Sequence, residues 1–150
     1  YNNNINYEKL EFLGDRVLGL TISEKLLEKY PEEKEGVIDK KFANLVNKKT
    51  CSNIAGKLDI KKFMLLGPSH NSLQRSSDKI MGDCLEALIG GIYLDGGLDY
   101  AEEFILNFLT KTKIISKSGN NIPICLPRKI IGCFMWFKIL ASSDPVLRSP

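Results

Sequence analysis

Acidic residues recur at helical spacing in residues 7–20, "YEKLEFLGDRVLGL". At 100° per residue, Glu8, Glu11 and Asp15 share a helix face about 60° wide, and Leu18 continues the same face. The carboxylates therefore extend an apolar stripe instead of opposing it. The positive end of the helix dipole accounts for an acid at the helix start, such as Glu8, but not for Asp15 two turns further on.

A second acidic pair lies in residues 80–97, "IMGDCLEALIGGIYLDGG". Asp83 and Glu86 are three residues apart, so they are neighbours on one helix face. The small residues Ala87 and Gly90 continue this face and would let another helix approach closely. If the two segments cross, four or five carboxylates converge.

Such a convergence predicts a site for divalent cations. Desolvating each carboxylate costs on the order of several kcal/mol, and like charges repel. No lysine, arginine or histidine lies on either acidic face as a partner, and oxygen ligands alone favour Mg²⁺ or Mn²⁺. Two such ions with a bound water suit the cleavage of phosphodiesters. Two alternatives stay open: a solvated helix face for each acid taken singly, and a di-iron carboxylate bundle, which needs Glu-x-x-His motifs that both segments lack.

The elements that must position these acids are predicted to be helices. Apolar residues recur with a period near 3.6 over residues 7–29, 37–57, about 77–94 and 98–110. The first helix should end at Tyr30-Pro31, because the residue before proline avoids the helical region. "DGG" at 95–97 should end the third, and Ser77-Asp78 could cap its start. No stretch alternates with period two, so we expect an all-α fold.

Composition limits the class of protein. The chain has 150 residues, of which 43% are hydrophobic and 26% charged, which fits one globular domain without a membrane span. The cysteines are Cys51, Cys84, Cys125 and Cys133, with no C-x-x-C pair and a single histidine in the chain. This pattern argues against a zinc site and a disulfide framework, and it predicts a reducing, cytoplasmic compartment.

The character of the chain changes near residue 112. After residue 110 the chain is rich in Lys and Arg and holds one acid, Asp144. Four of the six prolines lie beyond position 122, and no clear period is visible. We therefore divide the chain into a domain over 1–112 and a segment of unassigned structure over 113–150. The basic segment suits either contact with a polyanion or a solvated tail.

Three motifs, in order, resemble the ribonuclease III family. "EKLEFLGDRVL" (8–18) is similar to the family signature, and "GDCLEALIGGIYLDGG" (82–97) is similar to its second motif. "EGVIDKKFANLVNKKT" (35–50) resembles the helix between them. The likeness runs from about residue 7 to 109, and it implies an all-helical nuclease domain.

The resemblance also implies an activity. Such a domain forms a homodimer and hydrolyses both strands of double-stranded RNA, including precursors of ribosomal RNA. The reaction uses Mg²⁺, with Mn²⁺ as a substitute, and no small-molecule cofactor. It leaves 5′-phosphate and 3′-hydroxyl ends, and the RNA is recognised mostly through its shape, phosphates and 2′-hydroxyls.

The family's functional residues map onto positions of this chain. The implied metal ligands are Glu11, Asp15, Asp83 and Glu86, with Asp15 and Glu86 as the catalytic residues. Glu8 and Glu35 are implied as outer acids. Phe12 matches an aromatic residue that family members insert into the partner subunit, and core packing within one chain is its alternative.

The sequence also departs from the family pattern. Arg16 replaces a small residue after Asp15, where it could touch a phosphate, touch the partner chain or lie in solvent. Two upstream helices with a T-H-x-S motif are expected to be missing, and no double-stranded-RNA-binding module is recognisable after residue 112. Two alternatives therefore compete with the nuclease: a catalytically inactive ribonuclease III-like module that binds RNA or the ribosome, and a truncated, unstable product.

Overall fold

The structure is a computed structural model that describes residues 6–64 and 73–111, with the side chains of 73–77 and 109–111 excepted. Over these residues the chain forms helices and no strand, which confirms the all-α prediction. The elements are α1 (Tyr7–Lys29), α2 (Glu35–Val46), α3 (Lys48–Lys57), the 3₁₀ helix η1 (Ile60–Phe63), α4 (Leu73–Gly96) and α5 (Leu98–Lys111). The segment 113–150, which we left unassigned, lies outside the described residues.

Helix α1 has the predicted bounds. Its N-cap is Asn6, whose side chain accepts a hydrogen bond of 3.0 Å from the backbone N–H of Lys9. This bond satisfies one of the donors that a helix start leaves without a partner inside the helix. At the other end, the N–H of Tyr30 donates to the carbonyl of Leu26, and Pro31 follows.

The single helix predicted over 37–57 is wrong, because Asn47 divides it into α2 and α3. Asn47 has an extended backbone, and its side chain accepts a hydrogen bond of 2.8 Å from the N–H of Thr50, at the start of α3. The same side chain donates to the carbonyls of Ala43 and Asn44, at the end of α2. An asparagine that bonds to nearby backbone groups competes with the helical ladder, and apolar periodicity does not reveal this competition.

Helix α4 is longer than predicted. It begins at Leu73, so Ser77-Asp78 lies inside the helix and does not cap it. Asp78 instead accepts a hydrogen bond of 2.8 Å from the hydroxyl of Ser52 in α3. The predicted stop at 95–97 is confirmed: Gly97 has φ +88°, a left-handed conformation that favours glycine, and its N–H donates to the carbonyl of Tyr93.

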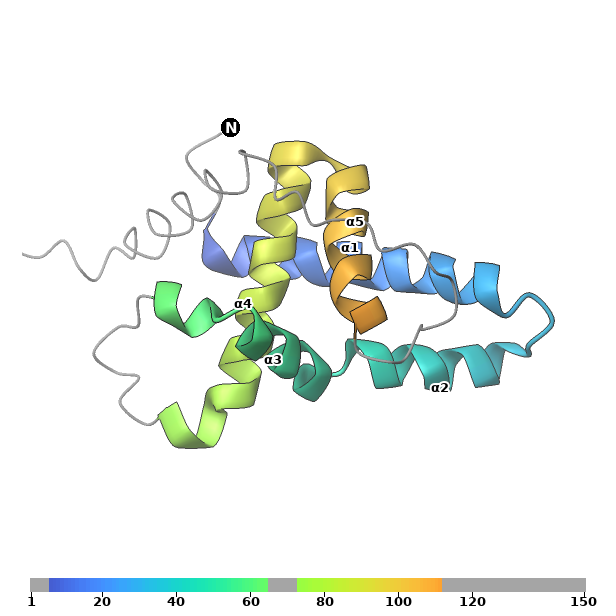
Figure 1. Ribbon diagram of the computed structural model, residues 1–150, viewed down its shortest axis with the longest axis horizontal. Coiled ribbons are helices and arrows are strands. Elements are labelled where there is room, and N and C mark those ends of the chain that lie inside the picture. The colour runs from blue at the N-terminus through green and yellow to red at the C-terminus, as the bar shows by residue number, and fades with distance from the viewer. Residues whose placement is uncertain (1–5, 65–72, 112–150) are drawn as a thin grey trace, which may run out of the picture.

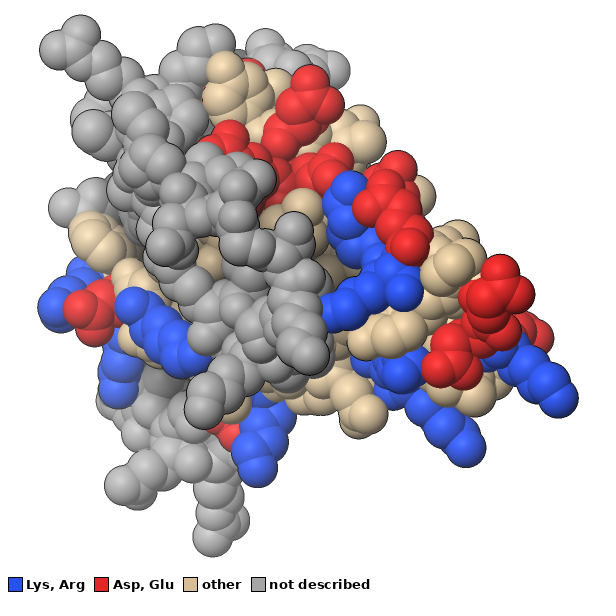
Figure 2. Space-filling model, turned by 45° about the vertical axis from the view of Figure 1, so that its right-hand side comes forward, with Lys and Arg blue, Asp and Glu red and all other residues tan. Residues whose placement is uncertain are grey.

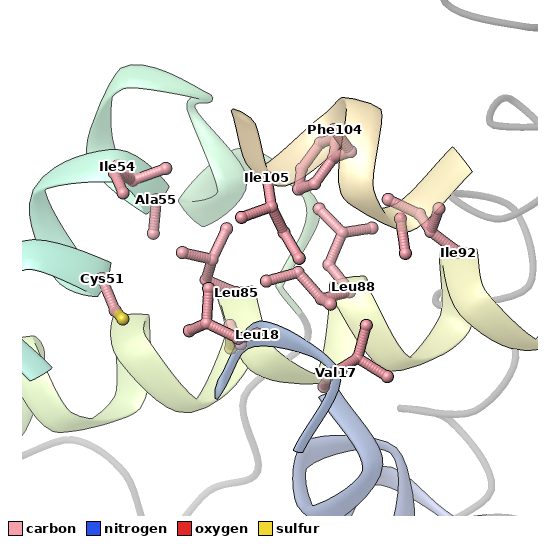
Figure 3. Close-up of a cluster of buried hydrophobic side chains, with 14 of the residues drawn as sticks. Val17, Leu18, Cys51, Ile54, Ala55, Leu85, Leu88, Ile92, Phe104 and Ile105 are labelled. Atoms are coloured by element: carbon pink, nitrogen blue, oxygen red, sulfur yellow. The ribbon is translucent and has the colours of Figure 1, made fainter. Parts of the chain in front are cut away.

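The helices enclose one apolar core. In Figure 1, α4 crosses α1 steeply and α2 returns beside α1. Figure 3 shows side chains from α1, α3, α4 and α5 meeting between the helices. The core residues in that view include Val17, Leu18, Ile54, Leu85, Leu88, Phe104 and Ile105. Burying each large apolar side chain contributes roughly 1.5–3 kcal/mol to the free energy of unfolding. This packing holds α1 and α4 in their crossed arrangement.

Two glycines let the backbones of α1 and α4 touch. A Cβ at Gly14 would lie 1.7 Å from the carbonyl oxygen of Glu86, and a Cβ at Gly90 would lie 2.2 Å from the carbonyl oxygen of Leu10. Neither position has room for a side chain. The contact between these two backbones sets how close the acids of one helix come to the acids of the other.

The described helices give no sign of a membrane span, since none is long and apolar enough to cross a bilayer. On the face shown in Figure 2, described Asp and Glu side chains gather toward the top, and Lys and Arg side chains lie beside and below them.

Candidate metal centre

Three carboxylates meet where α1 and α4 cross. Glu11 comes from α1, and Asp83 and Glu86 come from α4. One oxygen of each lies within 4.8 Å of the others. The side chain of Glu11 is half-buried, whereas Asp83 and Glu86 are 6% and 2% exposed. Asp83 and Glu86 are the two buried acids of the described residues, and charges in such a position need compensation.

Part of that compensation comes from two lysines, so the expectation that the acids lack a basic partner is wrong. The Nζ atom of Lys48 lies 2.7 Å from Asp83 Oδ1 and 2.7 and 2.9 Å from the two oxygens of Glu86. Lys79, one turn before Asp83 on α4, donates to Asp83 Oδ2 at 2.8 Å. Lys48 is 35 residues from Asp83, and nothing in its local sequence indicates the contact.

The two buried acids have opposite pKa shifts. Burial raises the pKa of the Glu86 carboxyl, and the hydrogen bond from Lys48 offsets only part of this effect. Burial acts on Asp83 in the same direction, but hydrogen bonds from Lys48 and Lys79 outweigh it and lower the pKa of Asp83. Burial and the nearby charge of Asp83 raise the pKa of Glu11. These shifts show three carboxylates that are electrostatically coupled.

Asp15 lies near the centre but outside the group of three. Its negative charge contributes to the raised pKa values of Glu86 and Cys51. Its carboxylate accepts a hydrogen bond from the guanidinium of Arg16, and about half of its side chain is exposed. Arg16, which replaces the family's small residue, therefore pairs with the implied catalytic acid beside it.

Glu8 and Glu35 do not join the cluster within one chain. Glu8 is exposed in the first turn of α1. Glu35 is exposed at the start of α2, just after the turn that follows α1. Glu11 lies in the second turn of α1 and Glu35 follows the far end of that helix, so about 27 Å of helix, at 1.5 Å per residue, lies between them.

Phe12 lies on the surface. Its side chain is 64% exposed, and the Arg16 guanidinium is 5.0 Å from the centre of its ring. The alternative that Phe12 packs into the core of its own chain is therefore wrong. An exposed phenylalanine one residue after Glu11 is free to contact another molecule close to the acidic cluster.

The donor set fits a hard divalent cation. The three converging ligands are all carboxylates, with no histidine or thiol among them. Mg²⁺ and Mn²⁺ prefer oxygen ligands of this kind, and Mg²⁺ is held in proteins by few carboxylates together with water and phosphate oxygens.

Cys51, which packs beside this centre, gives a prediction for pH dependence. Burial raises the pKa of its thiol to about 11, against about 8.5 in an unfolded chain. The folded chain therefore disfavours the ionised thiolate by on the order of 3 kcal/mol. This contribution to the free energy of unfolding is fully present below the unfolded pKa, and it is lost as the pH rises through about 11. At pH 8 we expect iodoacetamide to alkylate Cys51 at least about 100-fold more slowly in the folded chain than in urea. Peptide mass mapping checks this rate, and equal labelling of both states would contradict the burial.

Fold and site together define a class of protein: an all-helical domain that buries a carboxylate cluster where two helices cross. Comparison with known proteins gives the family. The family model described as Ribonuclease-III-like matches residues 1–113. The chain therefore belongs to the ribonuclease III family.

Individual relatives agree with this assignment. The chain is 63% identical over 102 residues to Ribonuclease 3 of Pelagibacter ubique, and 44% identical over 113 residues to Ribonuclease 3 of Brucella canis. These matches cover 68% and 73% of this chain, but only 46% and 45% of the relatives, so the chain spans less than half of their length.

Solved structures share the fold. A nuclease domain of ribonuclease III from Campylobacter jejuni, described with structural flexibility in a region involved in dimer formation, superposes with a TM-score of 0.68. It is 37% identical, and the match covers 74% of this chain and 78% of that one. A second structure of the Campylobacter nuclease domain, 34% identical, has the same TM-score and covers 79% and 80% of the two chains.

Proposed function

We propose that this chain is a divalent-metal-dependent endoribonuclease domain that hydrolyses phosphodiester bonds of double-stranded RNA in the cytoplasm, including precursors of ribosomal RNA. The observation that carries the proposal is the nearly complete burial of Glu86 beside Asp83 and Glu11 at the α1–α4 crossing. Family membership supports the reaction class, because the relatives that the chain matches are ribonucleases.

The chain's own residues would hold the metal. Glu11, Asp83 and Glu86 supply the converging oxygens, and Asp15 would complete the set by turning from Arg16 toward the centre. A bound Mg²⁺ or Mn²⁺ supplies Lewis-acid polarisation of the phosphate and a water of lowered pKa. Burial of Glu86 and Asp83 keeps their positions fixed by packing, and it strengthens their electrostatic interactions.

A cleavage assay tests the proposal. The chain should cut a long RNA duplex in Mg²⁺ or Mn²⁺, should not cut it in excess EDTA, and should leave 5′-phosphate and 3′-hydroxyl ends. Single-stranded RNA of the same composition serves as the control. A folded sample that binds Mn²⁺ but leaves the duplex intact would contradict the activity.

One observation favours an inactive RNA-binding module as the second candidate. The Lys48 ammonium group touches both buried acids, so the fold compensates part of their charge with its own side chain. An inactive module would bind duplex RNA equally well with and without Mg²⁺. Its affinity should fall steeply with salt, as expected for contacts to phosphates.

We further propose that the domain acts as a homodimer in which Phe12 contacts the partner subunit. The exposed position of Phe12 supports this, as does the Campylobacter neighbour, whose description names a region involved in dimer formation. Each subunit would contribute one acidic centre. A dimer could then cut both strands of one duplex.

Phe12→Glu is expected to dissociate this dimer without unfolding the chain. Truncating a buried aromatic anchor costs about 2 kcal/mol or more, and a two-fold interface loses it twice, so the dissociation constant should rise roughly a thousandfold. Analytical ultracentrifugation gives the constant, and circular dichroism reports the fold. Leu98→Glu, at an exposed apolar residue on α5, is the matched control and should stay dimeric. A Phe12→Glu protein that remains dimeric at wild-type affinity would contradict the assignment.

A further inference from the structure

The ammonium group of Lys48 lies against two of the three carboxylates that could hold a metal ion. Its Nζ atom lies within 2.9 Å of one oxygen of Asp83 and both oxygens of Glu86. Those two side chains are 8% and 3% exposed, whereas the side chain of Lys48 is 45% exposed. Among the described residues, Lys48 is the cation that bridges both buried acids, since the more exposed Lys79 reaches Asp83 alone.

Packing, as well as charge, directs the Lys48 side chain to this position. Lys48 is the first residue of α3, and its side chain passes over α4 at Gly82. A Cβ at Gly82 would lie 3.1 Å from Lys48 Cδ and 3.4 Å from the Lys48 carbonyl oxygen. The missing side chain at Gly82 therefore leaves the space through which the lysine stem reaches the acids.

We propose that Lys48 is the resident counter-ion of the acidic centre, which a divalent cation must displace in order to bind. A divalent ion drawn to these carboxylates would be repelled by the ammonium group that already lies against them, and the two cations compete for the same lone pairs. In the metal-free chain the lysine offsets part of the charge of the buried acids. It thereby raises the concentration of Mg²⁺ or Mn²⁺ that is needed to fill the site. Because the Lys48 side chain is partly exposed, its ammonium group can move into solvent when the metal ion binds.

Lys48→Met tests this role, because methionine keeps an unbranched stem and removes the charge. Isothermal titration of the chain with Mn²⁺ should show at least about tenfold tighter binding in Lys48→Met than in the wild type, because the positive charge of the lysine no longer opposes the ion. Lys49→Met is the matched control, since Lys49 is exposed on the next position of α3. It should bind Mn²⁺ within about twofold of the wild type.

Gly82→Ala gives a second test that keeps the lysine. Alanine suits a helix, but its Cβ would push the Lys48 stem away by a few tenths of an ångström. We expect severalfold tighter binding of Mn²⁺ in this variant. If Lys48→Met fails to fold, Gly82→Ala decides the matter, because unchanged or weaker binding there overturns the role of Lys48.

The inference rests on the proposed metal centre, and the titrations separate the two. If neither the wild type nor Lys48→Met binds Mn²⁺, the metal centre itself is wrong. If the wild type binds and folded Lys48→Met binds equally or more weakly, the metal centre stands and the counter-ion role is overturned. Tighter binding in Lys48→Met, with no change in Lys49→Met, supports both.

Discussion

Glu86→Gln should lower the rate of duplex RNA cleavage by about 10²–10³-fold, the loss typical of removing one electrostatic group from an active site. The substitution keeps the shape of the side chain and removes the negative charge that attracts the metal ion. Burial opposes the charge of Glu86, and Lys48 keeps its contact with Asp83 in the variant, so we expect the chain to fold, which circular dichroism checks. A loss of activity would therefore not reflect a loss of fold.

The same variant should also lose affinity for Mn²⁺ in calorimetry. Its matched control is Glu24→Gln, which removes an exposed acid from α1 at a distance from the cluster. This control should cleave RNA at the wild-type rate. A folded Glu86→Gln protein with wild-type activity and metal affinity would show that Glu86 is not a ligand, and the proposed centre would have to be abandoned.

Gly14→Ala should destabilise the domain by more than about 4 kcal/mol, although alanine is normally the better helix former. The new Cβ would lie 1.7 Å from the carbonyl oxygen of Glu86 and 2.8 Å from the backbone N of Gly90. Both neighbours are backbone atoms, so no side-chain rotation relieves the overlap. Helices α1 and α4 would have to separate, and the core between them would lose its packing.

Thermal unfolding followed by circular dichroism measures this effect. A loss of that size should lower the unfolding midpoint by about 15–30 °C, or prevent folding altogether. Gly56→Ala in α3 is the matched control, because its Cβ would meet no atom within 4 Å. It should raise stability by roughly 0.5–1 kcal/mol. A Gly14→Ala protein as stable as the wild type would contradict the close contact of the two helices.

The sequence alone determined most of the fold. Apolar periodicity and end signals located α1 and α5 to within one residue, and "DGG" marked the end of α4. The helical spacing of Asp83 and Glu86 placed both on one face, and the small residues after them indicated a close helix crossing. These features are local, because a helix face and a helix end depend on residues a few positions apart.

Only the tertiary structure decided which acids meet and what balances their charge. Glu11, Asp83 and Glu86 converge, while Asp15 pairs with Arg16, and helical spacing alone could not separate these outcomes. Lys48 reaches the centre from the start of α3, which the sequence analysis predicted to be part of one helix with α2. Side-chain partners of this kind depend on the packing of distant segments, since charges interact through space and not along the chain.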